Sequence, residues 1–471
     1  MASQVQLRVQ EHYPEAKLRR LLSERFQCAG DTVEFIVSQD LSQNSGYFRL
    51  GNDAIGYGQC SSGRPARSAA DFLHDASEHV AIEGSSVYLP FDPSQVIDNL
   101  LYERYPQTGN KGTGAANTTL RRMYYAIRPL MPVAVRRPMQ RHHLRGWDGI
   151  PFPQWPVDRT VENLHEQLLV LSMKAQKVSR VPFIWFWPDG LPSCSMMTHD
   201  VETAAGVGFC PTLMDLNDSF GVKTSFNMIP EKRYPVPDSL LDSIRKRGFE
   251  INVHDLNHDG NLFRDKDEFL RRAERINQYR RQWGVQGFRS AVLYRNVDWY
   301  DALDIAYDMS IPNVAHLDPQ RGGCCTVLPF QVGNTLELPL TTTQDYSLFH
   351  ILNQYSIQLW KQQISLIREK HGLISFIVHP DYIIAERARD VYSQLLQYLS
   401  GMRERGETWI ALPSEVATWW RLRSKLSLVR EGDAWRIEGQ GRERARVAYA
   451  VRDGDQLTYH LCVAIPAGCC G

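Results

Sequence analysis

The sequence lacks several features that would assign it to a class at once. No apolar run approaches the roughly 18 to 20 residues that cross a bilayer, and the first residues lack the apolar stretch of a secretory signal. Basic and acidic residues balance at 53 each, so no net charge draws the chain to nucleic acid or to an anionic membrane. We therefore expect no transmembrane segment and no nucleic-acid partner.

The cysteines also lack the spacing of a disulfide framework or of a zinc knuckle. There are nine of them, an odd number, and none forms a Cys-x-x-Cys pair. Four stand in the adjacent doublets Cys324–Cys325 and Cys469–Cys470, which are awkward for bridges within a domain. This usage fits a reducing compartment, so we predict a cytoplasmic protein, either free or peripheral to a membrane.

What is present is the composition of a globular protein. The chain has 471 residues, of which 43% are hydrophobic and 23% charged, and it shows no internal repeat. Its length exceeds one ordinary core, so two or three domains are expected.

From about residue 193 to 422, short apolar segments alternate with longer amphipathic ones. The pattern predicts strands at 195–198, 224–229, 250–253 and 373–378, and helices at 212–220, 240–247, 265–282 and 383–402. Such alternation is typical of an α/β domain with parallel strands. Residues 426–471 instead alternate with period two around Gly-Asp turns, which predicts a small antiparallel β appendage.

Three polar clusters follow predicted strands. They are Thr198-His-Asp-Val-Glu202, His254-Asp-Leu-Asn-His258 and Val378-His-Pro-Asp381. Parallel α/β folds build their active sites at the carboxyl ends of strands. Two imidazoles and one carboxylate leave a metal position open for water, which is the catalytic rather than the structural pattern. The remaining carboxylate and histidine are then available as general base and general acid.

Each cluster also has a plainer interpretation. Two histidines four residues apart, such as His254 and His258, are more often surface residues than ligands. Asp200 and Glu202 fit a helix N-cap with first-turn acids as well as a site. If the backbone is extended there, both carboxylates point to the same side. The residues alone then leave open which is the ligand and which the base.

Taken in order, four segments resemble the motifs of the polysaccharide deacetylase (NodB-homology, carbohydrate esterase family 4) family: Thr198–Glu202, Gly248–Gly260, Gly287–Ser290 and Ile377–Pro380. The resemblance covers roughly residues 190–425. It implies a distorted (β/α) barrel with one divalent metal, usually zinc, that removes acetyl groups from N-acetylated sugars. It also divides the chain into an N-terminal α+β extension (1–160), the barrel (161–425) and the β appendage (426–471).

The resemblance implies a role for each matching residue. Asp200 would be the catalytic base, Arg289 would orient it, and His379 would be the acid. The metal ligands would be Glu202, His254 and His258. Two features depart from the family pattern. Glutamate at 202 has a longer arm than the usual aspartate, so Asp200 is an alternative ligand, and no proline follows Arg289 closely. The segment 337–345 also looks like a sugar-modifying branch of this group, with no role assigned to Asp345.

The expected function is therefore metal-dependent removal of N-acetyl groups from a sugar or polysaccharide precursor. The expected partner is an N-acetylated or lipid-linked glycan. One alternative keeps the fold and moves the substrate to a small non-sugar amide or a cyclic ureide. Another is a non-catalytic glycan-binding protein.

Overall fold

A curved sheet of nine strands dominates the computed structural model, which describes residues 21–28, 33–61, 63–106, 138–139, 141–142, 144–432 and 434–462. Eight strands follow the order β12-β13-β11-β10-β9-β8-β7-β14, and β15 lies beside β7. Their bounds are β7 (Cys194–Val201), β8 (Ser225–Met228), β9 (Glu250–His254), β10 (Gly287–Arg289), β11 (Tyr307–Asp308), β12 (Phe330–Val332), β13 (Thr335–Glu337), β14 (Leu373–Ile377) and β15 (Trp409–Ile410). Within this sheet, β12 pairs antiparallel with β13, and the other pairs are parallel.

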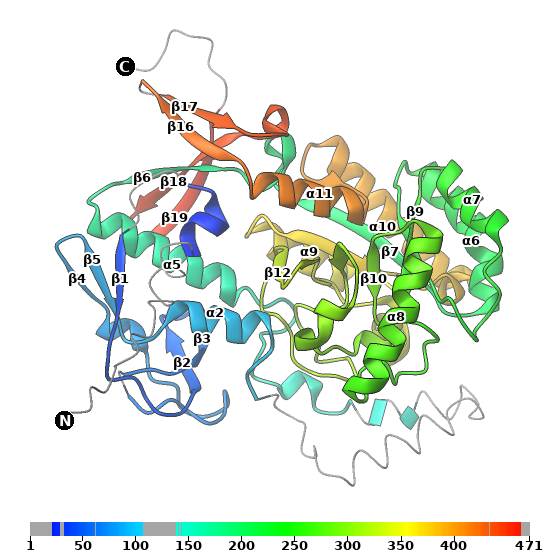
Figure 1. Cartoon of the computed structure of the whole chain (residues 1–471), viewed down its shortest axis with the longest axis horizontal. Coiled ribbons are helices and arrows are strands. Elements are labelled where there is room, and N and C mark those ends of the chain that lie inside the picture. The colour runs from blue at the N-terminus through cyan, green and yellow to red at the C-terminus, as the bar shows by residue number, and fades with distance from the viewer. Residues whose placement is uncertain are drawn as a thin grey trace, which may run out of the picture.

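Helices connect and cover these strands, as Figure 1 shows. They are α6 (Ala204–Ser219), α7 (Asp238–Lys246), α8 (Lys266–Trp283), α9 (Gln358–Arg368), α10 (Glu386–Glu404) and α11 (Pro413–Arg423). Every residue of β7, β8 and β14 is buried, as expected for parallel strands covered on both faces. The predicted alternation of strand and helix is confirmed, and this strand order fits a distorted (β/α) barrel.

Irregular backbone links the two ends of the sheet. Leu340 forms a bridge with Pro312, beyond the end of β11. The backbone N–H of Thr342 then donates to the carbonyl of Ser375 in β14, at 3.2 Å. A loop thus stands where a regular barrel would have a strand, which explains the distortion.

Helix α6 begins eight residues earlier than the sequence pattern predicts. The predicted helix started at Thr212, just after Pro211, but Pro211 lies inside α6. Thr203 is the N-cap, and its Oγ1 accepts from the backbone N–H of Gly206 at 3.0 Å. Asp200 still belongs to β7, so the N-cap interpretation of Asp200 is wrong.

The remaining elements lie away from α6 and α7 (Figure 1). On the N-terminal side these are β1 (Glu34–Val37), β2 (Gly46–Leu50), β3 (Ala54–Gly58), β4 (Ala81–Glu83), β5 (Ser86–Leu89), α2 (Pro93–Leu101), α5 (Thr160–Ala175) and β6 (Arg180–Ile184). At the C-terminal side they are β16 (Ser427–Glu431), β17 (Ala434–Glu438), β18 (Val447–Asp453) and β19 (Gln456–Leu461). Strand β18 pairs with both β19 and β6, so the last two strands share a sheet with β6, the strand that comes before β7 in the chain.

The short helices are η1 (Ala76–His79), η3 (Trp147–Gly149), η4 (Pro188–Gly190), η5 (Ala291–Leu293), η6 (Val297–Ala302), η7 (Ser347–Ile351), η8 (Pro380–Ile383) and η9 (Arg442–Arg444). Within the described ranges, none of the helices is both long and apolar enough to cross a bilayer.

Candidate metal and catalytic site

The predicted site residues meet at the carboxyl ends of neighbouring strands. Asp200 lies on β7 with Glu202 just beyond it, His254 ends β9, and Arg289 ends β10. His254 and Arg289 are direct partners in the sheet register. His379 follows β14, the other neighbour of β7. Parallel pairing therefore brings together residues that are up to 179 positions apart in the sequence.

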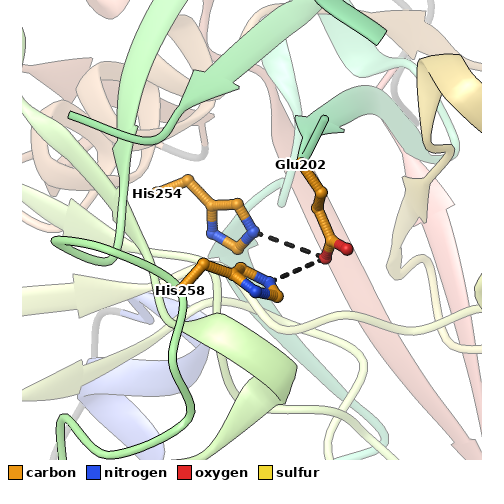
Figure 2. Close-up of side chains that lie close together, drawn as sticks. All are labelled: Glu202, His254 and His258. Atoms are coloured by element: carbon orange, nitrogen blue, oxygen red, sulfur yellow. Dashed lines mark ion pairs between the residues drawn. The ribbon is translucent and has the colours of Figure 1, made fainter. Parts of the chain in front are cut away.

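Three donor atoms face one another in the arrangement of a metal site (Figure 2). Glu202 Oε1 lies 2.8 Å from His258 Nε2 and 3.8 Å from His254 Nε2. The ligand atoms of these three residues all lie within 4.8 Å of one another. Donors around a tetrahedral ion at about 2.1 Å stand roughly 3.3 Å apart, so the spacing fits one ion.

The histidine nitrogens are buried, and the Nε2 atoms face carboxylate oxygens in ion pairs rather than in well-aligned hydrogen bonds. His254 Nδ1 donates to the carbonyl of Arg289 at 3.1 Å, so its Nε2 is the unprotonated nitrogen when the ring is neutral. Within the described residues, no hydrogen bond reaches His254 Nε2 or either nitrogen of His258. An unpaired buried polar atom costs about 1–3 kcal/mol. Coordination of a divalent cation would satisfy these nitrogens, so the residues present fit such an ion.

The second histidine reaches the site on a loop rather than on a helix. Asp255 and His258 both have left-handed backbone, with φ of 54° and 53°. The N–H of Asp255 donates to the Arg289 carbonyl at 2.7 Å, which ties this loop to the end of β10. Non-glycine residues in this conformation carry strain that is common at functional sites. This loop brings the His258 ring to within 4.8 Å, centroid to centroid, of the His254 ring.

Asp200 is buried, ionised and held by an amide. Its Oδ1 accepts from Asn227 Nδ2 at 2.7 Å, and its Oδ2 lies 3.8 Å from His254 Nε2. Burial raises the pKa of Asp200, but the charges of Arg289, His254 and His379 outweigh it and bring the pKa below its ordinary value. Arg289 acts through its charge, because its hydrogen bond within the described residues goes to Thr198 Oγ1.

His379 is held by a carboxylate to which the sequence assigned no role. Asp345 Oδ1 accepts from His379 Nδ1 at 2.6 Å, and Oδ2 accepts from the His379 backbone N–H at 2.7 Å. His379 Nε2 lies 3.4 Å from Glu202 Oε1. Burial lowers the pKa of His379, but Asp345 and Glu202 raise it well above its ordinary value. The imidazole is therefore protonated at neutral pH.

Asn227 belongs to a polar layer inside the barrel that sequence reasoning missed. Ser225 Oγ donates to Asn227 Oδ1 at 3.0 Å, and Asn252 Nδ2 donates to Ser225 Oγ at 3.1 Å. Asp200, Asn227 and Asn252 are partners across three adjacent strands, so their side chains share one face. A buried-type strand pattern with an asparagine at its centre, in both β8 and β9, was the signal that could have revealed this layer.

A pocket of about 100 Å³ opens beside Glu202, His258 and His379. The other lining residues are mostly apolar and include one amide, Gln344. They are Leu144, Val292, Leu317, Pro319, Gln344, Tyr346, Ile351 and Tyr382. Val292 stands near the place where the family pattern has proline, and it has left-handed backbone with φ of 61°. A β-branched residue is strained in this conformation. This pocket wall is therefore built differently from the proline-containing segment of the family pattern.

The chain was compared with known proteins. No protein-family model matches it, and no curated protein does. A protein from Mycobacterium smegmatis, assigned as a polysaccharide deacetylase, is similar at 19% identity and TM-score 0.41, over 53% of this chain and 97% of that one. Peptidoglycan deacetylase PdaC from Bacillus subtilis is similar at 11% identity and TM-score 0.32, over 49% and 93%. PuuE allantoinase is similar at 11% identity and TM-score 0.41, over 50% and 92%.

The chain resembles polysaccharide deacetylases. The structural neighbours thus include the family that the motifs indicated. At these TM-scores the similarity defines neither substrate nor mechanism, which depend on the residues of the site itself.

Proposed function

We propose that this chain is a metal-dependent hydrolase that removes an N-acetyl group from a sugar or a polysaccharide precursor. The observation that supports this most directly is the set of buried histidine nitrogens that face Glu202 without a well-aligned hydrogen bond. On either side of that set lie an ionised carboxylate, Asp200, and a protonated imidazole, His379. The three parts are those that metal-assisted amide hydrolysis requires.

Glu202, His254 and His258 would hold the ion, with zinc expected. Such an ion, when bound, polarises the amide carbonyl and lowers the pKa of a water molecule toward about 7. Asp200 is left to act as the base. Its Oδ1 is engaged by Asn227, and Glu202 Oε1 approaches His258 more closely than Asp200 Oδ2 approaches His254. This geometry favours Glu202 over Asp200 as the ligand.

The proton transfers follow from the fixed side chains. Asp200 accepts the proton of the attacking water, and the charge of Arg289 keeps that carboxylate ionised beforehand. His379 donates from Nε2 to the departing amine, because Asp345 occupies Nδ1. Without that proton an amine is a poor leaving group. The small pocket next to Glu202 and His379 would receive the acetamido group.

We also propose that the barrel segment, 161–425, supplies all of this chemistry. The N-terminal extension, 1–160, and the appendage, 426–471, would bind the glycan or stabilise the fold. A long precursor or a lipid-linked glycan remains the proposed partner.

The decisive experiment measures metal and acetate together. The purified chain should hold about one equivalent of zinc or a similar ion and release acetate from chitooligosaccharides. Glu202→Gln should weaken metal binding more than Asp200→Asn does, and the reverse order would exchange their roles. A chain that holds metal but opens only a cyclic ureide or a small amide would have the alternative hydrolase activity. A chain that takes up no zinc, even in excess, would not be a metal-dependent hydrolase.

A further inference from the structure

The pocket contains one polar side chain that the proposed reaction does not use. Gln344 lines the pocket beside His379, and its Nε2 donates to Asp318 Oδ1 at 2.6 Å. Asp318 stands between Leu317 and Pro319, which line the same pocket. The next residue after Gln344 is Asp345, which holds His379. Gln344 is therefore the chain neighbour of the carboxylate that holds the proposed acid.

The orientation of the Gln344 amide follows from its partner. Burial raises the pKa of Asp318 to about 6 despite the charge of Arg295, so at pH 8 the carboxyl is ionised and only accepts hydrogen bonds. Gln344 must then present Nε2 to Asp318, and its Oε1 points the other way. Among the contacts of the described residues, Oε1 has no partner. Gln344, a lining residue of the pocket, thus carries an acceptor oxygen that is turned away from Asp318 before any substrate binds.

The other side chains of the pocket limit which substrate groups can bind next to Gln344 Oε1. They are largely aliphatic, and no lysine or arginine of the described residues lines the pocket. Apart from His379, whose Nε2 already faces Glu202 Oε1 at 3.4 Å, and the proposed ion, an anionic group next to the scissile amide would find no further counter-charge among the described lining residues. The pocket therefore suits an uncharged group that brings one hydrogen-bond donor.

We propose that Gln344 determines specificity by accepting, at Oε1, a hydrogen bond from a hydroxyl group adjacent to the acetamido group of a neutral glycan. This inference rests on the proposed function and narrows it to a neutral N-acetylated sugar with a free neighbouring hydroxyl. When a bound substrate excludes water from the pocket, a Gln344 Oε1 that receives no hydrogen bond is desolvated without compensation. An analogue without the hydroxyl is then rejected, because sites built around a hydrogen bond discriminate strongly against its absence.

The test compares a chitooligosaccharide with its 3-deoxy analogue at pH 8. For the zinc-loaded wild type, we expect kcat/KM to favour the hydroxylated substrate by about tenfold or more. Gln344→Leu keeps the size of the side chain and should bring the ratio to about one with unchanged metal content. Asp318→Asn offers an amide donor that lets the Gln344 amide turn, so the ratio should also fall. Gln331→Leu, an exposed control on β12, should leave it unchanged.

Binding of the same two sugars, measured by calorimetry in an Asp200→Asn background, separates the two proposals. A tenfold binding preference that Gln344→Leu abolishes would support the role of Gln344 even if the wild type released no acetate, a result that would overturn only the proposed reaction. Equal binding of both sugars, or a preference that survives Gln344→Leu, would overturn the role of Gln344.

Discussion

Glu202 is the residue around which the site is arranged. Its Oε1 lies 3.8, 2.8 and 3.4 Å from the Nε2 atoms of His254, His258 and His379. The charges and contacts of these imidazoles bring the pKa of Glu202 well below its ordinary value, against the effect of burial. Glutamate departs from the usual aspartate, and its longer arm reaches this position from just beyond the end of β7.

Two of these histidines, His254 and His379, should respond differently to replacement. His254→Ala removes one of the three proposed ligands, so metal and activity should be lost together. His379→Ala removes the proposed acid, so metal should stay near one equivalent while kcat falls by about 100-fold or more. Elemental analysis and acetate release measure both effects. If His379→Ala also emptied the site, His379 would be a ligand and not the acid.

Asn227 provides a test of how Asp200 is aimed. Asn227→Leu keeps the branched shape of the side chain but removes the 2.7 Å hydrogen bond to Asp200 Oδ1. Hydrogen bonds to charged groups contribute about 1.5–3 kcal/mol, so kcat should fall about 10- to 100-fold with little change in KM or metal content. Ser225→Ala, one contact further from Asp200, is the matched control and should have a smaller effect. Equal losses in both variants would indicate general damage to the barrel interior.

At the scale of elements, two short paired strands bring two buried carboxyl groups into neighbouring positions. Asp308 on β11 and Glu337 on β13 are partners in the register. Asp308 Oδ1 accepts from Ser310 Oγ at 2.6 Å, and Glu337 Oε1 accepts from the N–H of Ile311 at 2.9 Å. Burial first, and then the charge of Asp308, raise the pKa of Glu337 well above its ordinary value. The folded protein therefore favours the protonated form of Glu337.

This pair predicts a loss of stability as the pH rises. The folded pKa of Glu337 lies above its unfolded value near 4.5. The contribution of Glu337 to the free energy of unfolding is therefore complete below that pH. It declines as the pH rises toward the folded pKa, by up to about 1.4 kcal/mol per pH unit. Glu337→Gln keeps a neutral group and removes this decline. Urea unfolding of both proteins between pH 5 and 9 should show the variant gaining relative stability with pH, and parallel curves would contradict the assignment.

At the scale of the whole molecule, the two ends of the described chain share one apolar core. The Phe183 ring of β6 lies 5.8 Å from Phe26 and 5.4 Å from Tyr459, centroid to centroid. Arg423 at the end of α11 donates to the carbonyls of Ile184 and Trp185, behind the same cluster. The β appendage is thus packed into the protein and is not a separate unit attached to it.

Metal binding should stabilise the fold as a whole. An ion that binds only the folded chain stabilises it by about 2.7 kcal/mol at a concentration 100 times its Kd. Chelation should therefore lower the Tm by a few degrees, and added zinc should restore it. His254→Ala should show neither change, whereas Gln331→Leu should behave like the wild type. A Tm that chelation does not alter would contradict a ligand role for the three residues.

Local patterns in the sequence were enough to locate the strands of the barrel and the clusters at their ends. Apolar runs and turn residues are properties of neighbouring positions, so β8, β9 and β14 could be predicted within a few residues. The same patterns failed at α6, which they placed at 212–220, whereas the helix begins at Ala204 after the N-cap Thr203. Proline is tolerated there inside the helix, which no local rule indicates.

What the tertiary structure alone decided are the contacts between distant positions. Asn227 meets Asp200 across 27 positions, and Asp345 meets His379 across 34. The pairing of β18 with β6 joins segments more than 260 positions apart. Such contacts depend on strand order and register, which arise from packing of the whole chain. The sequence was therefore enough to indicate which residue types form the site. Only the fold decided which oxygen of each carboxylate contacts which partner.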